Sequence, residues 1–338
     1  MSLYRKMQGY ASSEPLRLHT PGHKGALSKV DLTELTDDSF PSDDLVRAQA
    51  YAAEVFGARH ARFLCGGSSQ GVKSAVFYAG ANAVVDVNSH RSVFDGFILS
   101  GKRCVTAGER GGVRPLTVEQ IDEKLTADIG AVIITSPTYY GYSADVNGIA
   151  EYCKRKGLMF IIDGAHGAHF GFSEHLPKSF AGACDICNVS AHKTLFALTQ
   201  SALLFDNLSD ENSAKLGDAV DVMGSTSPSY LLYASIEYAV DKLAAVETRA
   251  AYDALYAPIE SIKSDFAFLK NDDFTRLVLD CGAEGVDAKK LNDELIRRGV
   301  YSEMVDGRHI VFIFTAADSE GGVARLAAAL DNGLRKLK

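Results

Sequence analysis

Short apolar runs alternate with amphipathic stretches between about residues 60 and 205, a pattern typical of a mainly parallel sheet covered by helices. Only the last two runs lack a helical segment between them. Their connection, about a dozen residues long, is short for a crossover, so we expect one antiparallel strand there. The runs predict seven strands, at residues 62–65, 83–87, 103–106, 131–135, 158–162, 186–189 and 202–205.

Several helices carry recognisable end signals. Thr117-Val-Glu-Gln120 has the sequence of a capping box, and Asp145 is expected to open a helix that Gly157 ends. Beyond Pro228 a long helical pattern begins at Tyr230, with aromatic and aliphatic residues at helical spacing. We interpret it as a helix that faces the core and a second copy of the chain.

The pattern changes again after about residue 255, which predicts a small α+β domain. The domain is expected to contain a strand at 274–279, a helix at 287–298, a strand at 309–314 and a closing helix. We therefore expect three parts: an N-terminal arm at 1–30, a large cofactor-binding domain at 31–235, and a linking helix with the small C-terminal domain at 236–338.

Composition excludes several classes of protein. The 338 residues include 35 basic and 43 acidic side chains, a formal net charge of −8, and the basic residues form no stripe that would suit nucleic acid. No apolar run approaches the ~20 residues that span a bilayer, and the first residues lack the apolar core of a signal peptide. Six scattered cysteines suit reduced thiols, so we expect a cytoplasmic protein without a membrane partner.

Two groups of residues raise the possibility of a metal. Cys184 and Cys187 have CxxC spacing, but no second CxxC or CxxH pair accompanies them, which favours ordinary packing. Asp163, His166 and His169 could also converge on an ion, but no fourth ligand is evident. The sequence therefore favours no metal site.

Small and polar residues follow the strands, where ligands bind in open α/β sheets. Gly66-Gly-Ser-Ser-Gln-Gly71 leads into a helix, whose free N–H groups and serine hydroxyls suit a phosphate. Asp163 ends a very apolar strand and needs a cationic or hydrogen-bonding partner, such as a protonated heterocyclic nitrogen. Lys193 follows the sixth strand, where a lowered pKa would make it a Schiff-base nucleophile. Together these features predict a pyridoxal-phosphate site.

Seven segments in order strengthen this interpretation: 19–24 (HTPGHK), 48–57 (AQAYAAEVFG), 89–92 (SHRS), 135–139 (TSPTY), 163–172, 190–195 (SAHKTL) and 224–230 (GSTSPSY). With them the chain resembles the ornithine/lysine/arginine decarboxylases, which are fold-type-I pyridoxal-phosphate enzymes. The resemblance implies a transferase-like α/β fold, with a seven-stranded mainly parallel sheet and helices on both faces. It also implies decarboxylation of lysine, ornithine or arginine to the corresponding amine and CO2.

The resemblance also implies roles for individual residues. Lys193 would carry pyridoxal 5'-phosphate as a covalent Schiff base, Asp163 would pair with the ring nitrogen, and His90 would stack on the ring. The other cofactor contacts it implies are Ser68, Ser69, Gln70, Ser190 and His192 around the phosphate or the lysine, Ala165 and His166 along the ring, and Ser225 or Thr226 from a neighbouring subunit of a homodimer. The catalytic set would be Lys193, His192, His90 and Asp163, with Lys193 or His192 returning a proton to the substrate. Simpler roles stay open for three histidines, since His90 could cap a helix, and His19 and His23 could fold the arm.

The chain departs from the family pattern in two respects. Gly164 replaces an acidic residue of many members, and the C-terminal part is compressed, which leaves the substrate contacts open. Glu303 is either the acidic residue that often lies near the substrate or a solvated charge. The alternatives to decarboxylation are transamination or elimination on the same cofactor, and a cofactor-binding paralogue of low activity with a regulatory role.

Overall fold

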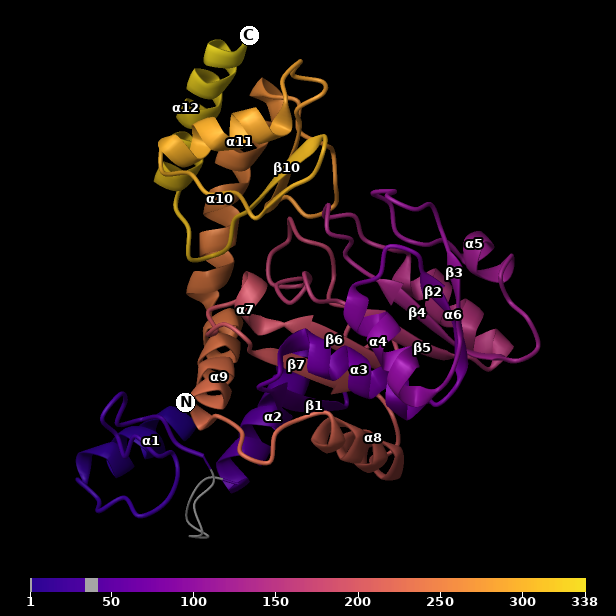
Figure 1. Ribbon diagram of the computed structural model, residues 1–338, viewed down its shortest axis with the longest axis vertical. Coiled ribbons are helices and arrows are strands. Elements are labelled where there is room, and N and C mark those ends of the chain that lie inside the picture. Colours follow the sequence, from indigo (N-terminus) through magenta and orange to yellow (C-terminus); the bar gives the residue numbers. More distant parts are fainter. Residues whose placement is uncertain (1, 34–41) are drawn as a thin grey trace.

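The structure is a computed structural model that describes residues 2–33 and 42–338. Figure 1 shows an N-terminal arm with helix α1 (Leu3–Ser12), a large α/β unit and a smaller C-terminal unit. Helices α9 (Tyr230–Ala244) and α10 (Val246–Asp265) run along one side of the molecule and connect the three parts.

A seven-stranded sheet forms the centre of the large unit, and all seven predicted strands are confirmed with small differences at their ends. Strand β7 is antiparallel to β1 and β6, as its short connection predicts, and the other pairs are parallel. In spatial order the strands are β1 (His60–Leu64), β7 (Ala202–Asp206), β6 (Ile186–Ser190), β5 (Met159–Asp163), β4 (Ile129–Thr135), β2 (Asn82–Asp86) and β3 (Cys104–Ala107).

The two faces of this sheet bury different side chains, because successive residues of a strand point to opposite sides. In β4, Val132 and Ile134 belong to one apolar cluster, and Ala131 and Ile133 belong to the other. The second cluster is closed by α3 (Gly67–Ala79), α4 (Arg91–Ser100) and α8 (Asp210–Val222), and the first by α2 (Ser42–Phe56), α5 (Val118–Asp122), α6 (Val146–Lys156) and α9. Helices thus cover both faces, as predicted.

The predicted helix ends are confirmed. Thr117 caps α5 with a complete capping box, in which Gln120 reaches back to the Thr117 N–H. Asp145 accepts a hydrogen bond of 3.0 Å from the Gly148 N–H at the start of α6. Gly157 ends that helix at a φ of +69°, a left-handed conformation that favours glycine. Among the described residues, no helix is both long and apolar enough to cross a membrane.

The C-terminal unit contains a three-stranded antiparallel sheet with two helices, which confirms the predicted α+β pattern. Its strands lie in the order β8 (Arg276–Asp280), β10 (His309–Ile313) and β9 (Met304–Val305), and its helices are α11 (Ala288–Arg297) and α12 (Glu320–Leu337). Strand β9 was not expected, because two residues are too few to produce a visible alternation.

The expected division at residue 235 falls inside α9, which packs against α1 and α2 of the preceding parts. The start of α1 is tied to this helix, because the Ser2 and Leu3 N–H groups donate to the Glu237 carboxylate over 2.6 and 3.1 Å. These contacts do not test the division into 1–30, 31–235 and 236–338, which stays a prediction.

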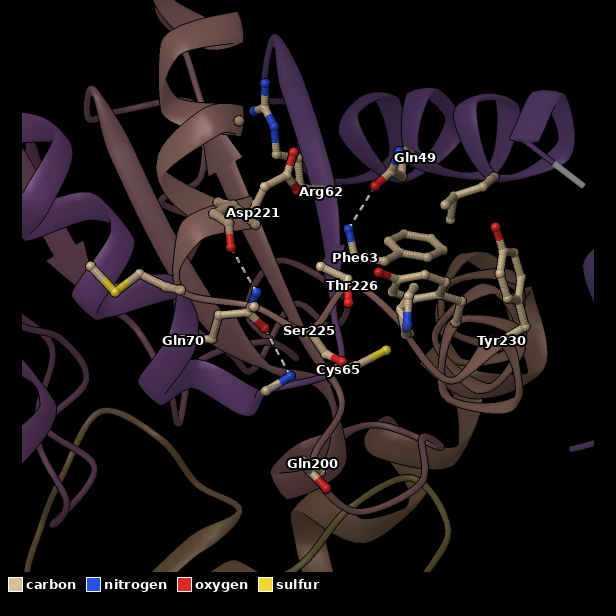
Figure 2. A pocket seen from close by; sticks show the side chains of 18 residues that line it. Gln49, Arg62, Phe63, Cys65, Gln70, Gln200, Asp221, Ser225, Thr226 and Tyr230 are labelled. Carbon is tan, nitrogen blue, oxygen red and sulfur yellow. Dashed lines mark hydrogen bonds between the residues drawn. The ribbon is translucent and has the colours of Figure 1, made fainter. Parts of the chain in front are cut away.

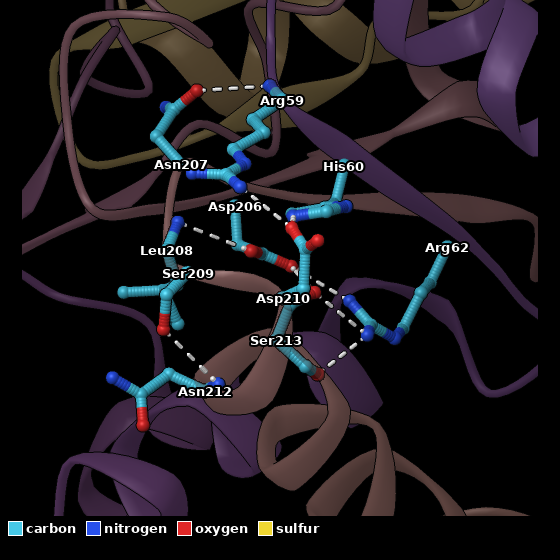
Figure 3. A network of polar contacts seen from close by, with 10 residues as sticks. All are labelled: Arg59, His60, Arg62, Asp206, Asn207, Leu208, Ser209, Asp210, Asn212 and Ser213. Atoms are coloured by element: carbon cyan, nitrogen blue, oxygen red, sulfur yellow. Dashed lines mark hydrogen bonds and ion pairs between the residues drawn. The ribbon is translucent and has the colours of Figure 1, made fainter.

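A buried carboxylate fixes the antiparallel edge of the large sheet (Figure 3). Asp206 is fully buried, and its Oδ2 accepts hydrogen bonds from Arg62 over 2.7 Å and from the Ser213 hydroxyl over 2.9 Å. The same arginine donates to the Ser213 hydroxyl over 2.9 Å. Arg62 lies on β1, Asp206 on β7 and Ser213 on α8. This network therefore connects the two strands at this edge to α8.

Candidate active site

A pocket of about 560 Å³ lies at the carboxyl ends of the parallel strands. Parallel strands end at the same edge of a sheet, so the loops after β1, β2, β4, β5 and β6 all contribute side chains. Nine of the predicted site residues line it: Ser68, Ser69, His90, Asp163, Ala165, His166, Ser190, His192 and Lys193.

The N-terminus of α3 forms one wall of this pocket. Gly67 opens the helix at a φ of +67°, and Ser68 and Ser69 follow it in the first turn. The Ser68 hydroxyl hydrogen-bonds the hydroxyl of Ser190 at the end of β6. The first N–H groups of a helix have no partner within the helix, so this wall can bind an anion such as phosphate.

Asp163 presents a buried carboxylate at the end of β5, with 3% of its surface exposed. Its Oδ1 accepts a hydrogen bond of 3.3 Å from the Ala165 N–H. Burial raises the pKa of Asp163, although the charges of Lys193 and His90 act in the opposite direction. A ligand that brings an N–H cation to this carboxylate would favour its charged form, as a protonated ring nitrogen does.

Lys193 lies in the short helix α7 (Ala191–Thr194), directly after β6. Its Nζ is 3.0 Å from Nε2 of His166, whose Nδ1 is 3.1 Å from Nη2 of Arg276. Burial lowers the pKa of Lys193 and Arg276 lowers it further, while Asp163 and Glu303 raise it. A lysine whose neutral form is favoured in this way is suited to nucleophilic attack on a carbonyl group.

The predictions did not include Arg276 or Tyr139 among the site residues. Arg276 opens β8 and is fully buried, and the Tyr139 ring lies edge-on to His166 with centroids 4.7 Å apart. Tyr139 stands in a segment that carried the family resemblance, although no role was assigned to it. The sequence gives a weaker indication for Arg276. It consists only of the position of this arginine directly before the apolar run Leu277-Val-Leu279.

The two other pocket histidines have defined hydrogen bonds. His90 caps α4, because its Nδ1 accepts a hydrogen bond of 3.2 Å from the Ser92 N–H. The capping role is therefore confirmed, and stacking of His90 on a cofactor ring stays a prediction. His192 lies 2.9 Å from the Ser201 carbonyl oxygen through Nδ1. Because a carbonyl only accepts, Nδ1 of His192 carries a proton, and Nε2 is the nitrogen with a free lone pair in the neutral ring.

Gln70, Ser225 and Thr226 do not line the lysine pocket. They line a neighbouring pocket of about 710 Å³, shown in Figure 2, and the two pockets share Gly66 and Gln200. Both ends of the Gln70 amide are occupied, since Oε1 accepts from the Gly66 N–H over 2.9 Å and Nε2 donates to the Val220 carbonyl over 3.1 Å. Gln70 thus holds the glycine turn in place through its side chain.

The groups considered for metal binding have other partners. His169 Nε2 lies 3.2 Å from Asp273, and His166 contacts Lys193 and Arg276. Within residues 2–33 and 42–338, no group of three or more His, Cys, Asp or Glu side chains is arranged to hold a metal ion. All six cysteines are free, and the CxxC pair at 184 and 187 is buried in the main apolar core.

The histidines of the arm hydrogen-bond to residues within the arm or directly after it. His19 Nε2 is 2.6 Å from the Tyr10 hydroxyl, and His23 Nε2 is 3.0 Å from Asp31. His23 Nδ1 also accepts a hydrogen bond of 3.0 Å from the Gly25 N–H. The arm-folding interpretation of both histidines is confirmed by these contacts.

Gly164 and Glu303 now have a structural setting. A Cβ atom at Gly164 would lie 2.5 Å from the Phe180 ring, so the buried ring occupies the space that a side chain would need. Glu303 is exposed and accepts a hydrogen bond of 2.8 Å from the Tyr139 hydroxyl. Because Tyr139 lines the lysine pocket, this contact puts the Glu303 carboxylate at the pocket rim.

Solved structures with the same fold are fold-type-I enzymes. Lysine decarboxylase A from Pseudomonas aeruginosa matches with a TM-score of 0.78 and 18% identity, over 98% of this chain and 59% of that chain. A serine palmitoyltransferase from Sphingomonas wittichii matches with a TM-score of 0.70 and 19% identity, over 87% of this chain and 77% of that chain. An SPT structure solved with PLP matches with a TM-score of 0.69 and 15% identity, over the same shares. The fold is therefore that of the fold-type-I PLP enzymes.

The sequence comparisons define the family. The model of the Orn/Lys/Arg decarboxylase major domain matches residues 26–280. An arginine decarboxylase of Bacillus subtilis (strain 168) is 29% identical over 379 residues, covering 97% of this chain and 76% of that protein. The chain belongs to the Orn/Lys/Arg decarboxylase family, and it is an enzyme of the decarboxylase class.

We expect Gly164→Ala to lower the free energy of unfolding by about 1–3 kcal/mol, the usual cost of overpacking a filled core. The physical reason is the 2.5 Å approach of the new Cβ to the Phe180 ring. Urea unfolding of the wild type and the variant measures the difference. Phe180→Leu should make Gly164→Ala less costly, and equal costs in both backgrounds would contradict the steric explanation.

Proposed function

We propose that the enzyme binds pyridoxal 5'-phosphate through a covalent Schiff base to Lys193 and decarboxylates a basic amino acid. Lysine, ornithine and arginine are the candidate substrates, and the products are the corresponding amine and CO2. The observation that carries the proposal is the convergence of Lys193, Asp163 and the N-terminus of α3 on one pocket. Relatives named arginine decarboxylase and lysine decarboxylase support the same reaction.

The residues present fit this cofactor. When bound, the cofactor supplies an aldehyde for the Schiff base and a protonated ring that accepts the electron pair released with CO2. Ser68, Ser69 and the free N–H groups of α3 would hold the phosphate. Asp163 would hold the ring N–H, since opposite charges about 4 Å apart attract by roughly 4 kcal/mol at an effective dielectric near 20.

Two groups of this chain can return a proton to the substrate carbon that loses CO2. Lys193 is the first, because its Nζ reaches into the pocket beside His166. His192 is the second when its Nε2 also carries a proton, since its Nδ1–H is engaged by the Ser201 carbonyl. Both residues line the pocket that holds Asp163.

The rim of the pocket is suited to a cationic substrate. Glu303 contacts Tyr139, which lines the pocket, while the more distant Asp306 accepts a hydrogen bond of 2.7 Å from the Tyr140 hydroxyl and pairs with His309. Both carboxylates come from the C-terminal unit and face the loop after β4. We propose that Glu303 attracts the side-chain cation of the substrate.

We propose that the enzyme is a cytoplasmic homodimer, in which Ser225 or Thr226 contacts the phosphate at the neighbouring subunit's site. The six free cysteines suit the reducing cytoplasm. Leu16, Leu18 and Leu27 of the arm are 83–87% exposed, which favours a surface that a second copy covers. Figure 1 shows this arm projecting beyond α9, away from the large sheet.

Incubation with lysine, ornithine and arginine tests the reaction directly. We expect CO2 together with cadaverine, putrescine or agmatine, and the amine identifies the substrate. Lys193→Ala should lose turnover and the yellow, borohydride-reducible cofactor, while Lys154→Ala on the exposed end of α6 should keep both. In the wild type, a keto-acid product would favour transamination, and bound cofactor without turnover would favour the regulatory paralogue. In Lys193→Ala, a borohydride-reducible adduct would overturn the assignment of Lys193 as the Schiff-base lysine.

We expect Glu303→Gln to raise KM about fivefold with a small change in kcat, because an exposed ion pair contributes at most ~1 kcal/mol. Steady-state kinetics on the preferred substrate measures both parameters. The matched control is Glu260→Gln on α10, which removes an exposed carboxylate that pairs with Lys263. An unchanged KM in Glu303→Gln would show that Glu303 is only a solvated charge.

Light scattering after size exclusion tests the dimer. The wild type should elute at twice the chain mass, and the double variant Leu16→Glu with Leu18→Glu should elute as a monomer, because buried carboxylates disfavour association. Ile98→Glu on α4 is the control, since Ile98 is also strongly exposed but lies on the large unit. A monomeric wild type would contradict the proposed shared site.

A further inference from the structure

Three nitrogen-bearing side chains form one line of contacts beside the pocket. Arg276 Nη2 lies 3.1 Å from His166 Nδ1, and His166 Nε2 lies 3.0 Å from Lys193 Nζ. Arg276 is fully buried and His166 is 5% exposed, so water contributes little to these contacts. The residues come from three places in the fold: the start of β8, the loop after β5 and α7.

The chemistry of the three groups fixes the direction of each hydrogen bond. A guanidinium can only donate, so Nδ1 of His166 must accept and cannot carry a proton. The neutral imidazole then has its proton on Nε2, and this N–H points to Lys193 Nζ. An amine accepts a hydrogen bond only through its lone pair, so Lys193 must be neutral in this arrangement.

We propose that Arg276 is a positioning residue that fixes the His166 tautomer and thereby holds Lys193 as a neutral amine. The inference deepens the proposed function and rests on it for the identity of the carbonyl compound that Lys193 attacks. In the condensation, the amine lone pair forms the bond to the aldehyde carbon. The C=N bond is then completed as the aldehyde oxygen leaves as water, which carries away both amine hydrogens. An ammonium group cannot begin this step.

The charges around Lys193 act in both directions, and together with burial their net effect lowers its pKa. Burial and Arg276 lower the pKa of Lys193, while Asp163 and Glu303 raise it. Burial also holds the pKa of His166 well below its usual value, and the charge of the neighbouring Arg276 acts in the same direction. A neutral His166 is therefore consistent with the hydrogen-bond directions.

Arg276 is poorly satisfied for a structural arginine. Among the described residues, its Nε and Nη1 are buried and without a hydrogen-bond partner. Buried donors without partners cost free energy, so the hydrogen bonds of Arg276 within the described residues do not by themselves account for its burial. Its Nη2 reaches His166 instead, where it controls the ring that contacts the lysine.

Capture of pyridoxal 5'-phosphate by the apoenzyme tests the proposal through its pH dependence. In Arg276→Met, Nδ1 of His166 is released, Nε2 can accept from a Lys193 ammonium, and the pKa of the lysine should rise. The midpoint of the pH profile for formation of the yellow adduct should then move up by about one unit. At pH values below both midpoints this corresponds to roughly tenfold slower capture. Arg276→Lys, which keeps a buried cation, should restore part of the shift, and an unchanged midpoint in folded Arg276→Met would overturn the proposal.

Two controls separate the His166 path from general effects. Arg308→Met removes a more exposed arginine from the same sheet, where it pairs with Asp280, and should leave the midpoint unchanged. In a His166→Ala background, Arg276→Met should add a much smaller shift than in the wild type. Equal shifts in both backgrounds would show that Arg276 acts through its charge alone, which overturns the positioning role.

Nitrogen NMR of the histidine-labelled apoenzyme gives a readout that needs no cofactor and no arginine variant. The signals of His166, assigned by their loss in His166→Gln, should be those of a neutral ring with its proton on Nε2. A proton on Nδ1, or an imidazolium at pH 7, would overturn the inference. A wild type that forms no adduct would contradict the proposed function, while this measurement would still decide the tautomer.

Discussion

The parallel register between β5 and β6 is the constraint on which the site depends. Asp163, the last residue of β5, pairs with Asn188, and β6 continues two residues further to Ser190. The four-residue helix α7 then carries Lys193 over the ends of the strands. A slip of one residue would reverse the faces of every side chain on a strand, so both apolar clusters that enclose the sheet enforce this register.

Burial at this edge pushes three titratable groups of the site toward their neutral forms. The pKa of Asp163 is raised, and those of Lys193 and His166 are lowered, in each case chiefly because water is excluded. The pocket is therefore prepared for a ligand that offers a cationic N–H to the carboxylate and a carbonyl carbon to the amine. Its other wall, the N-terminus of α3, suits an anion. One pocket can therefore bind a ligand that carries a cationic N–H, a carbonyl carbon and an anionic group.

Local signals in the sequence were sufficient for most of the fold. The strand positions, the capping box at Thr117 and the left-handed stop at Gly157 depend on short-range periodicity and backbone sterics. Asp163 and Lys193 were identifiable because a charge directly after an apolar strand requires a chemical reason. The pocket that Gln70 lines could not be predicted from local signals, since the direction of its side chain depends on how α3 packs against α8. The place of Arg276 in the site could not be predicted from local signals either, because only the folding of the C-terminal unit brings it to His166.

The C-terminal unit is part of the site, because it supports the pocket at several points. Arg276 contacts His166, Asp273 contacts His169, and Glu303 contacts Tyr139. The first two contacts are buried, whereas the third lies at the rim, where solvent screens it. A substitution at the rim can therefore leave the buried supports of the lysine in place. This separation divides the contacts of the C-terminal unit into two that hold the buried histidines beside the lysine and one that holds an exposed carboxylate at the rim.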